Sequence, residues 1–445
     1  MKTKKKLLHF ITLSICLCQT LHMSARTWTL DECIGYAMEN NITLQKAGLT
    51  RQSDAETTLA SKAALLPSLS FSTSQNVAYQ PWKANGVATV QNGLVETNAT
   101  TTSYNGTYSV SANWTVWNGN RNRNTILQNE NMEQQAEQDS ITYARNIEEQ
   151  IAQLYIQILY TKEAIEVNKA TLEAAKVNEE RALQMVDVGS MSKADCSQLT
   201  AQRAQDEYNV VQAESNARNY KRQLKALLQL TDDEDFDVVS PQATDDMALQ
   251  PIPSQQSVYE AAIENRPEMH KAQLAVESAE IQQKLAKAQR MPTVSLQAAV
   301  GTNTSSLSNN GWGEQMKSNF NAGAGVTISV PIFDQRSAKS AVNKANIMRQ
   351  EALLDIRDKQ TSLYSTIENY WIQATNNQSQ YKAAKVSTKA AQDSYDLLSE
   401  QFAVGLKNTV ELQEGKTRLL SAQQSELQSK YMTILNIKML EFYKK

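Results

Sequence analysis

An acidic pair near the end of the chain has the clearest capacity for chemistry. Glu411 and Glu414 stand three residues apart in a segment with helical spacing, so their carboxylates share one helix face. Repeated around a symmetry axis, they would form stacked anionic rings that favour cations. Two such charges about 6 Å apart repel by roughly 3 kcal/mol at an effective dielectric near 20, so closing the rings would require Lys407, a proton or a bound cation. The alternative is that acids in a first helical turn merely complement the helix dipole.

Enzymatic chemistry has few candidates in this chain. Of the three histidines, His9 and His22 lie in the N-terminal segment, which leaves His270. A single histidine cannot supply a Cys/His metal cluster or a Ser/His/Asp set. We expect His270 to be a surface or packing residue. The residue inventory therefore predicts no enzyme, no metal site and no cofactor.

The N-terminus is typical of a secretory signal peptide. Four lysines within the first six residues precede an apolar segment at 7–21, and Met23-Ser24-Ala25 is an imperfect cleavage site. A lipoprotein signal ending at Cys16 fits less well, because Ile15 is too bulky for its place. Removal of residues 1–25 changes the formal net charge from −3 to −7, since the segment carries four lysines and no acids. A mildly acidic chain does not favour nucleic-acid binding.

The rest of the chain is polar, with a mean hydropathy of −0.49 and no apolar run of about 18 residues, so no transmembrane helix is predicted. Two cysteines remain after the signal peptide, Cys33 and Cys196. An oxidising compartment allows a disulfide between them. Because they belong to segments that we expect to be far apart, two small buried side chains are the better interpretation.

The second half of the chain repeats the first. With a shift of 216 residues several pairs coincide, namely Val116-Trp117 with Ile332-Phe333, Val188-Gly189 with Val404-Gly405, and Asp195 with Glu411. Upstream the shift is 225, and Pro67 aligns with Pro292. The difference of nine residues places one insertion between Pro67 and Trp117. A period this long indicates a duplicated structural unit and not a solenoid.

Each repeat is predicted to run helix, hairpin, helix, turn, helix. The first helices are expected over about 29–65 and 254–290, with a proline ending each. Long helices follow over about 119–187 and 335–403, and about 69 residues would span roughly 100 Å. Gly189 and Gly405 end them, and antiparallel helices return over about 192–230 and 409–443.

The domain boundaries follow from this order of elements. We assign residues 1–25 to the signal peptide, 26–230 to the first repeat with helices at about 118–230, and 254–445 to the second repeat with helices at about 334–443. Residues 231–253 are acidic, contain three prolines and are expected to be an irregular linker.

Hairpins are predicted between the helices, at about 67–117 and 292–333. Their strands alternate apolar residues with small polar ones, most clearly over 104–116 and 320–330. Polar loops at 81–103 and 304–318 connect the strands, and the first loop is the natural place for the insertion.

The strand length suits an outer membrane. The 11 residues from Tyr104 to Trp114, at about 3.4 Å each and about 45° tilt, cover roughly 26 Å of apolar band. Four strands cannot close a barrel, and an open edge facing lipid leaves backbone groups unpaired. Two chains would give eight strands and a filled lumen, whereas three would give twelve and room for a channel. The alternative, a water-soluble hairpin pair, would need an apolar partner sheet that the sequence does not supply.

Taken together, these features resemble the TolC family of outer-membrane efflux proteins. The marks are the duplication, the proline followed by a strand, the strand-to-helix junctions at Trp117 and Phe333, and the two Val-Gly turns. The resemblance implies a mainly α fold with a β-hairpin pair per chain. It implies a homotrimer whose 12-stranded β-barrel in the outer-membrane lipid continues into a long periplasmic α-helical barrel. It also implies a passive exit duct, without a cofactor, that meets an inner-membrane transporter through a periplasmic adaptor protein.

The resemblance assigns roles to residues at the two turns. The implied pore constriction comprises Asp195, Phe402, Lys407, Glu411 and Glu414. The implied adaptor-docking tip comprises Val188, Gly189, Ser190, Val404, Gly405 and Leu406. The family more often has Asp at the ring positions and Leu or Thr in place of Ser190. Glutamate is longer and more flexible, which leaves the width of the constriction open.

Three functions compete. The first is the outer-membrane exit duct of a tripartite efflux pump or a type I secretion system. The second is a periplasmic coiled-coil scaffold without a pore, which salt would release from membranes. The third is a carboxylate-dependent hydrolase, for which the elongated pattern offers no concave site. The residues do not name the transported substrate, the adaptor or the pump.

Overall fold

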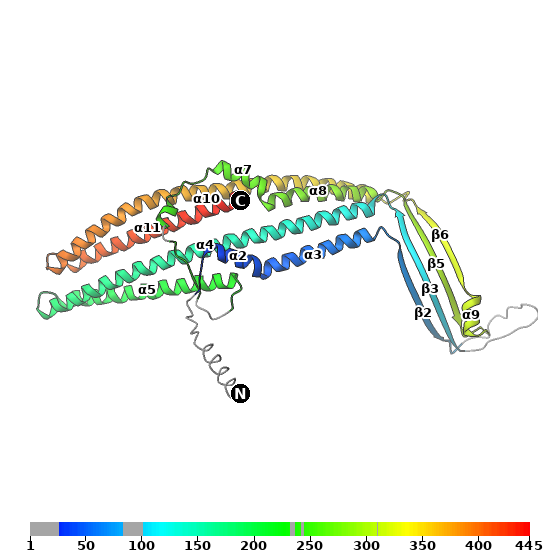
Figure 1. The fold of residues 1–445 in the computed structure, drawn as a ribbon, viewed down its shortest axis with the longest axis horizontal. Coiled ribbons are helices and arrows are strands. Elements are labelled where there is room, and N and C mark those ends of the chain that lie inside the picture. The colour runs from blue at the N-terminus through cyan, green and yellow to red at the C-terminus, as the bar shows by residue number, and fades with distance from the viewer. Residues whose placement is uncertain (1–25, 83–100, 232–235, 242–243, 309) are drawn as a thin grey trace, which may run out of the picture. The chain divides into compact units, whose positions relative to one another are not determined.

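A computed structural model describes residues 26–82, 101–231, 236–241, 244–308 and 310–445 (Figure 1). The predicted signal peptide and most of the first polar loop lie outside these ranges. The chain forms two compact units. The helical unit comprises the described residues within 1–47, 140–269 and 360–445, and the sheet unit comprises those within 48–139 and 270–359. None of the described helices combines the length and the hydrophobicity that a membrane-spanning helix requires.

The sheet unit contains one four-stranded antiparallel sheet. Its strands are β2 (Ser68–Tyr79), β3 (Thr102–Trp117), β5 (Thr293–Ser305) and β6 (Asn321–Ser329), in the order β2-β3-β5-β6. The two hairpins therefore join through β3 and β5, and β2 and β6 are each paired on one side only within the described chain (Figure 1). This arrangement confirms the predicted mainly helical fold with a β-hairpin pair.

The sheet has one apolar face and one polar face, as the alternation predicted. The register sets Val110 opposite Phe71 on one side and opposite Val300 on the other. The same face carries Leu69, Val77, Tyr104, Tyr108, Trp114, Leu296, Val326 and Ile328. On the opposite face serines bond across the strands, with Oγ–Oγ distances of 2.9 Å for Ser70–Ser111 and 2.7 Å for Ser72–Ser109. One face therefore suits an apolar environment, and the other suits water.

The second polar loop contains a helix that the sequence did not predict. This helix, α9 (Trp312–Ser318), begins seven residues after the end of β5. Gln315 is buried at 5% exposure, its Oε1 accepts the Ser305 N–H at 2.7 Å, and its Nε2 donates to the Asn310 carbonyl at 2.6 Å. A seven-residue helix has little stability of its own, so these tertiary bonds stabilise it.

The long helices occur where the sequence predicted them. They are α4 (Arg121–Asp187) and α10 (Ser337–Ala403), each of 67 residues, and the returning helices are α5 (Lys193–Leu227) and α11 (Thr409–Lys444) (Figure 1). Both long helices run through the two units. Proline is absent from each of them, and this absence permits an unbroken backbone hydrogen-bond ladder.

Two residues in the left-handed backbone region connect strand to helix in each repeat. Gly119 and Asn120 have φ of 67° and 63°, and the aligned Gln335 and Arg336 have φ of 51° and 70°. The duplication therefore preserves a backbone conformation even where it does not preserve glycine. At Gly119 the space is also closed, because an added Cβ would lie 2.2 Å from the Cβ of Met291.

We expect Gly119→Ala to destabilise the sheet unit. An L-residue in this region costs about 1–2 kcal/mol, and displacing Met291 adds an overpacking cost of about 1–3 kcal/mol. Gly189→Ala is the matched control, since Gly189 has φ of 75° and open space around its Cβ position. Melting temperatures of both purified variants measure the difference. Equal losses would show that Met291 moves aside freely.

The first helix of each repeat is broken, which corrects the continuous helices predicted over 29–65 and 254–290. The pieces are α2 (Leu30–Asn40) and α3 (Ile42–Ala63), and α7 (Gln255–Asn265) and α8 (Pro267–Ala288). At the first break Asn41 is 3% exposed, and its Nδ2 donates to the Leu227 carbonyl at 3.0 Å. At the second, Pro267 follows an extended Arg266 with ψ of 130°, as expected of a residue before proline.

Arg266 is stabilised at the second break by a buried ion-pair network. Its guanidinium lies 3.3 Å from Glu149 and 3.0 Å from Glu268, and it stacks 4.2 Å above the ring centre of Tyr443. Burial raises the pKa of Glu149, although the neighbouring guanidinium opposes that rise. The break therefore places the Arg266 side chain in the interior of the helical unit, where a continuous helix would not place it.

The linker between the repeats is ordered where it is described, which corrects the prediction of an irregular segment at 231–253. The strand β1 (Arg26–Trp28) pairs in parallel with β4 (Phe236–Val238), and α6 (Thr244–Ala248) follows. Asp245 of α6 bonds to Lys385 at 2.7 Å and to Lys430 at 3.2 Å. The Lys385 hydrogen bond, with smaller contributions from other partners, lowers the pKa of Asp245 to about 2.

The main core of the helical unit surrounds this linker. Trp28, Tyr155 and Leu228 belong to one buried cluster with Cys33, Ile151, Ile158, Leu224, Val238, Tyr381 and Tyr431. The Tyr155 hydroxyl donates to the Val239 carbonyl at 2.6 Å, which satisfies a polar atom in apolar surroundings. The core thus ties the start of the described chain and the linker to α4, α5, α10 and α11.

Candidate functional site

The two helix-connecting turns have the same backbone structure. Gly189 and Gly405 have φ of 75° and 76°. In the first turn the N–H groups of Gly189 and Ser190 donate to the carbonyls of Val186 and Met185 at 3.0 and 2.8 Å. In the second turn Gly405 and Leu406 donate to Phe402 and Gln401 at 3.0 and 2.9 Å. This hydrogen-bond pair is the Schellman motif, which confirms that the glycines end the long helices.

Apolar side chains project from both turns into solvent. Val188, Val404 and Leu406 are 78%, 70% and 74% exposed. Backbone capping explains the glycines but does not explain exposed branched residues beside them, because a capped turn needs no apolar surface.

The helix that follows each turn begins with a side-chain cap and an acid. Ser192 Oγ accepts the N–H of Asp195 at 3.1 Å, and Asn408 Oδ1 accepts the N–H of Glu411 at 2.9 Å. Glu411 Oε2 in turn accepts the Asn408 N–H at 3.2 Å, which completes a capping box. The two aligned acids therefore both stabilise a helix start, as the simpler interpretation of the sequence expected. This role at the helix start leaves the carboxylate charges of Asp195 and Glu411 available for a second role.

Lys407 is the direct partner of Glu411. Its Nζ lies 2.5 Å from Glu411 Oε1, and both side chains are more than one-third exposed. The hydrogen bond from Lys407, followed by that from the Asn408 backbone, lowers the pKa of Glu411 from its usual 4.5. Within one chain, Lys407 thus offsets the charge of an acid that the family resemblance assigns to the same constriction.

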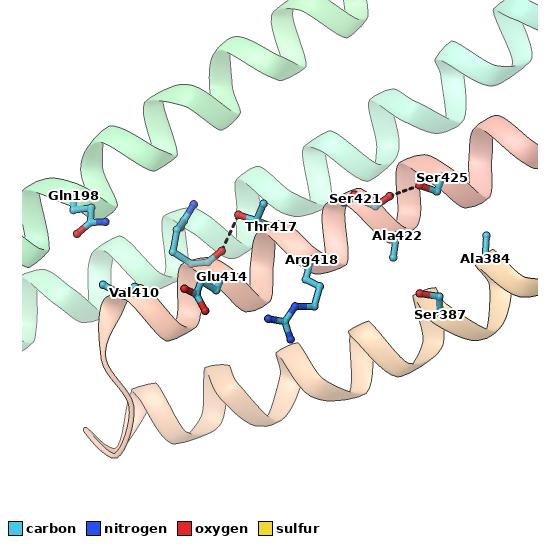
Figure 2. Close-up of a pocket in the computed structure, with 11 residues that line it drawn as sticks. Gln198, Ala384, Ser387, Val410, Glu414, Thr417, Arg418, Ser421, Ala422 and Ser425 are labelled. Carbon is cyan, nitrogen blue, oxygen red and sulfur yellow. Dashed lines mark hydrogen bonds between the residues drawn. The ribbon is translucent and has the colours of Figure 1, made fainter.

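Glu414 lies on a different feature, an open groove of about 620 Å³ along α11 (Figure 2). Ala384 and Ser387 of α10 form one side, Glu414 and Arg418 of α11 the other, and Gln198 of α5 lies at one end. Small side chains on both helices create the space. Glu414 is exposed in this groove, where it presents its charge to solvent one helical turn beyond Glu411.

Phe402 is buried within the chain. It is 0% exposed and packs among Ala182, Cys196, Leu199, Tyr395, Leu412 and Leu419, which come from α4, α5, α10 and α11. This cluster, the tip core, packs the two helical hairpins together near their turns. In this conformation Phe402 therefore positions the turn and does not present its ring to solvent.

Sequence reasoning missed a buried ion pair beside the tip core. Lys416 of α11 bonds to Asp206 of α5, and their side chains are 7% and 2% exposed. Nearby, Asn178 Nδ2 donates to the Tyr395 hydroxyl at 3.2 Å. A lysine between Leu412 and Leu419 on one apolar stripe was the available signal, since lysine is seldom buried without a partner.

The remaining single residues have simple surroundings. Cys33 and Cys196 are both free and buried, in the main core and in the tip core respectively. Burial raises the pKa of the Cys33 thiol to about 12, so this cysteine is unreactive. His270 is exposed, as predicted. Among the described residues, no three His, Cys, Asp or Glu side chains are grouped to hold a metal ion.

Known proteins share both this sequence pattern and this fold. The sequence model of the family described as "Outer membrane efflux protein" matches residues 258–437. The Outer membrane protein TolC of Escherichia coli (strain K12) is 23% identical over 406 residues, which cover 89% of this chain and 78% of TolC.

Solved structures extend the likeness in fold to 93% of the chain. A structure of CusC superposes with a TM-score of 0.78 at 15% identity, over 93% of this chain and 91% of CusC. The CmeC outer membrane channel of Campylobacter jejuni gives 0.76 at 17% identity, over 93% of this chain and 85% of CmeC. At such identities the structures establish the fold. The chain is thus similar in sequence to outer membrane efflux proteins over residues 258–437, and similar in fold to solved outer membrane channels over 93% of its length.

Proposed function

We propose that this chain is the outer-membrane exit duct of a tripartite efflux pump or of a type I secretion system. Three copies would complete one barrel from their sheets, and the long helices would continue the duct through the periplasm. Substrates would pass passively, driven by an inner-membrane transporter that is reached through a periplasmic adaptor. The division into a signal peptide at 1–25, repeats at 26–230 and 254–445, and a linker at 231–253 belongs to this proposal.

The sheet is the observation that carries the proposal. Its apolar face is exposed, with Phe71 at 67% and Val326 at 62%, and its opposite face is lined by serines and threonines. The edges at β2 and β6 each leave a row of backbone donors and acceptors for another strand. A barrel built from several copies satisfies all three surfaces. Its apolar face meets lipid, its polar face meets water, and its strand edges pair with strands of neighbouring copies.

The turns support the proposed ends of the duct. Glu411 and Glu414 would form the anionic rings of the constriction, with Asp195 beside them, Lys407 as counter-charge and Phe402 as the support behind the turn. The exposed Val188, Val404 and Leu406, with Gly189, Ser190 and Gly405, would form the tip that meets the adaptor. Apolar side chains on a turn at the end of a hairpin suit a protein partner.

Membrane extraction tests the proposal directly. We expect the protein to stay in the outer-membrane fraction through high-salt and alkaline washes and to need detergent for release. The purified oligomer should then give cation-selective single-channel currents in planar bilayers. Release by salt as a soluble monomer, with no conductance, would favour the periplasmic scaffold instead.

A further inference from the structure

The short helix α9 lies on the apolar face of the sheet. Tyr108 and Thr302 are opposite each other in the β3–β5 register, and they point to the face that carries Val110. The Trp312 ring meets the Tyr108 ring edge-on, with centres 6.3 Å apart and planes at 87°. The Thr302 hydroxyl donates to the Met316 carbonyl at 2.9 Å. Two separate contacts therefore place α9 over the apolar face.

Hydrogen bonds hold α9 against the end of β5. The buried Gln315 bonds to Ser305 and Asn310, as described above. Just after the helix, Asn319 Nδ2 donates to the Asn303 carbonyl at 2.7 Å. Both the middle and the end of α9 are thus bonded to the last residues of the strand or to the loop that follows it. The position of the helix is defined by the sheet.

The exposed aromatic residue of α9 continues a row of others. Trp312 is 61% exposed, and Tyr79 and Tyr104, at the same end and on the same face of the sheet, are 67% and 59% exposed. Along β3, Tyr104 lies ten residues from Trp114, or about 24 Å at about 45° tilt, which is the height of an outer-membrane apolar band. Tyr104 therefore lies at the height expected for one aromatic belt of a barrel, and Trp312 contacts Tyr108, four residues from Tyr104 along the same strand.

We propose that α9 is an interfacial anchor that binds the lipid of the outer leaflet. Trp312 lies at the boundary between acyl chains and headgroups, where amphipathic rings are favoured. The exposed Glu314 and Lys317 of the same helix cancel in net charge, so the aromatic ring carries the anchoring. The inference rests on the proposed function, because it takes the apolar face to be the lipid-facing one. It has a consequence for transport, since a loop fastened outside the barrel does not cover the lumen.

Depth-dependent fluorescence quenching tests the anchor. The full-length protein is reconstituted in phosphatidylcholine vesicles, and the contribution of Trp312 is the emission lost in Trp312→Phe. Lipids brominated near the headgroup end of the acyl chain should quench this contribution, and aqueous acrylamide should not. Trp371→Phe gives the control, because Trp371 belongs to α10 in the helical unit and should not be quenched by brominated lipid. A Gln315→Ala variant, which frees the helix from β5, should lower the quenching of Trp312 by lipid and raise its quenching by acrylamide.

A second tryptophan separates this inference from the proposed function. Trp114 lies on the same apolar face at the other end of the band, and it should be quenched by brominated lipid if that face meets the membrane. Quenching of Trp114 together with acrylamide quenching of Trp312 would overturn the anchor and leave the barrel intact. A Trp312 contribution insensitive to both quenchers would also overturn it and would indicate burial against a second copy. Loss of lipid quenching at Trp114 would overturn the barrel itself.

Discussion

Lys416→Met should destabilise the helical unit by about 3–5 kcal/mol, because it leaves the Asp206 carboxylate buried without its counter-charge. Asp206 is 2% exposed, so water cannot replace the ammonium group. The amide of Gln202 donates to Asp206 at 3.1 Å, but a neutral donor compensates a buried charge only in part. Circular dichroism melts and urea unfolding of the purified oligomer measure the loss.

Two variants make this prediction specific. Lys416→Met combined with Asp206→Leu removes both charges and should recover most of the stability, since a buried ion pair can be replaced by apolar groups at little cost. Lys176→Met removes a lysine from the exposed pair with Glu173, whose side chains are 50% and 68% exposed, and should change stability by less than about 1 kcal/mol. If Lys416→Met behaved like Lys176→Met, the pair would be solvated in solution.

The same variant should affect the channel. Lys416 and Asp206 join α11 to α5, directly beside the tip core that packs the two hairpins together. Loosening this contact leaves the hairpins less firmly fixed, so we expect longer and more frequent open events in Lys416→Met than in Lys176→Met.

Lys407→Ala should raise the open probability of the reconstituted channel. Within each chain, Lys407 Nζ lies 2.5 Å from Glu411 Oε1 and offsets the charge of this carboxylate. Without the lysine, the Glu411 carboxylates of neighbouring copies repel one another. Repulsion between carboxylates that have lost their counter-charge opposes closure, so the ratio of open to closed states should rise. Single-channel recordings at moderate salt measure the open probability.

Glu411→Ala should also raise the open probability, because it leaves the Lys407 charges of neighbouring copies without their partners. Its cation selectivity should be weaker, because the negative charge of the ring is lost. Lys193→Ala is the matched control, since Lys193 is an exposed lysine at the start of the other hairpin's returning helix. Unchanged conductance and selectivity in both Lys407→Ala and Glu411→Ala would remove these residues from the gate.

The pH dependence of selectivity provides a separate measurement. Lys407 lowers the pKa of Glu411 below its usual 4.5, so the wild-type ring keeps its charge until the pH falls through that lowered value. In Lys407→Ala the pKa returns towards 4.5, and protonation begins at a higher pH. Cation selectivity should therefore disappear at a higher pH in the variant than in the wild type. Coincident pH profiles would mean that the 2.5 Å bond does not persist in the open channel.

The long helices, the four long strands and their order along the chain can be predicted from the sequence. Proline and glycine act on the backbone of their own neighbourhood, and strand and helix periods are visible within a dozen residues. The ends of α4 and α10 at their glycine turns, the four strands and the capped starts of α5 and α11 follow from such local rules. The duplication supports each prediction, because a pattern that occurs in both repeats is less often misleading than a pattern that occurs once.

Which side chains meet depends on tertiary packing. Asp206 and Lys416 are 210 residues apart, and neither the helical period nor the repeat pairs them, because each aligns with a different kind of residue in the other copy. Phe402 fits an aromatic gate position by sequence, yet four helices bury it in the tip core. The break at Asn41 depends in the same way on a distant carbonyl, that of Leu227.

The second polar loop could be predicted from the sequence, whereas the helix α9 within it depends on tertiary contacts. The residues of α9 contain no strong helix signal, and the sheet stabilises the helix through Gln315 and Thr302. Which face of the sheet it covers depends on the β3–β5 register, and that register depends on contacts between two strands nearly 200 residues apart. Local conformation is set by short-range sterics and hydrogen bonding, whereas the sites arise where packing brings separate segments together.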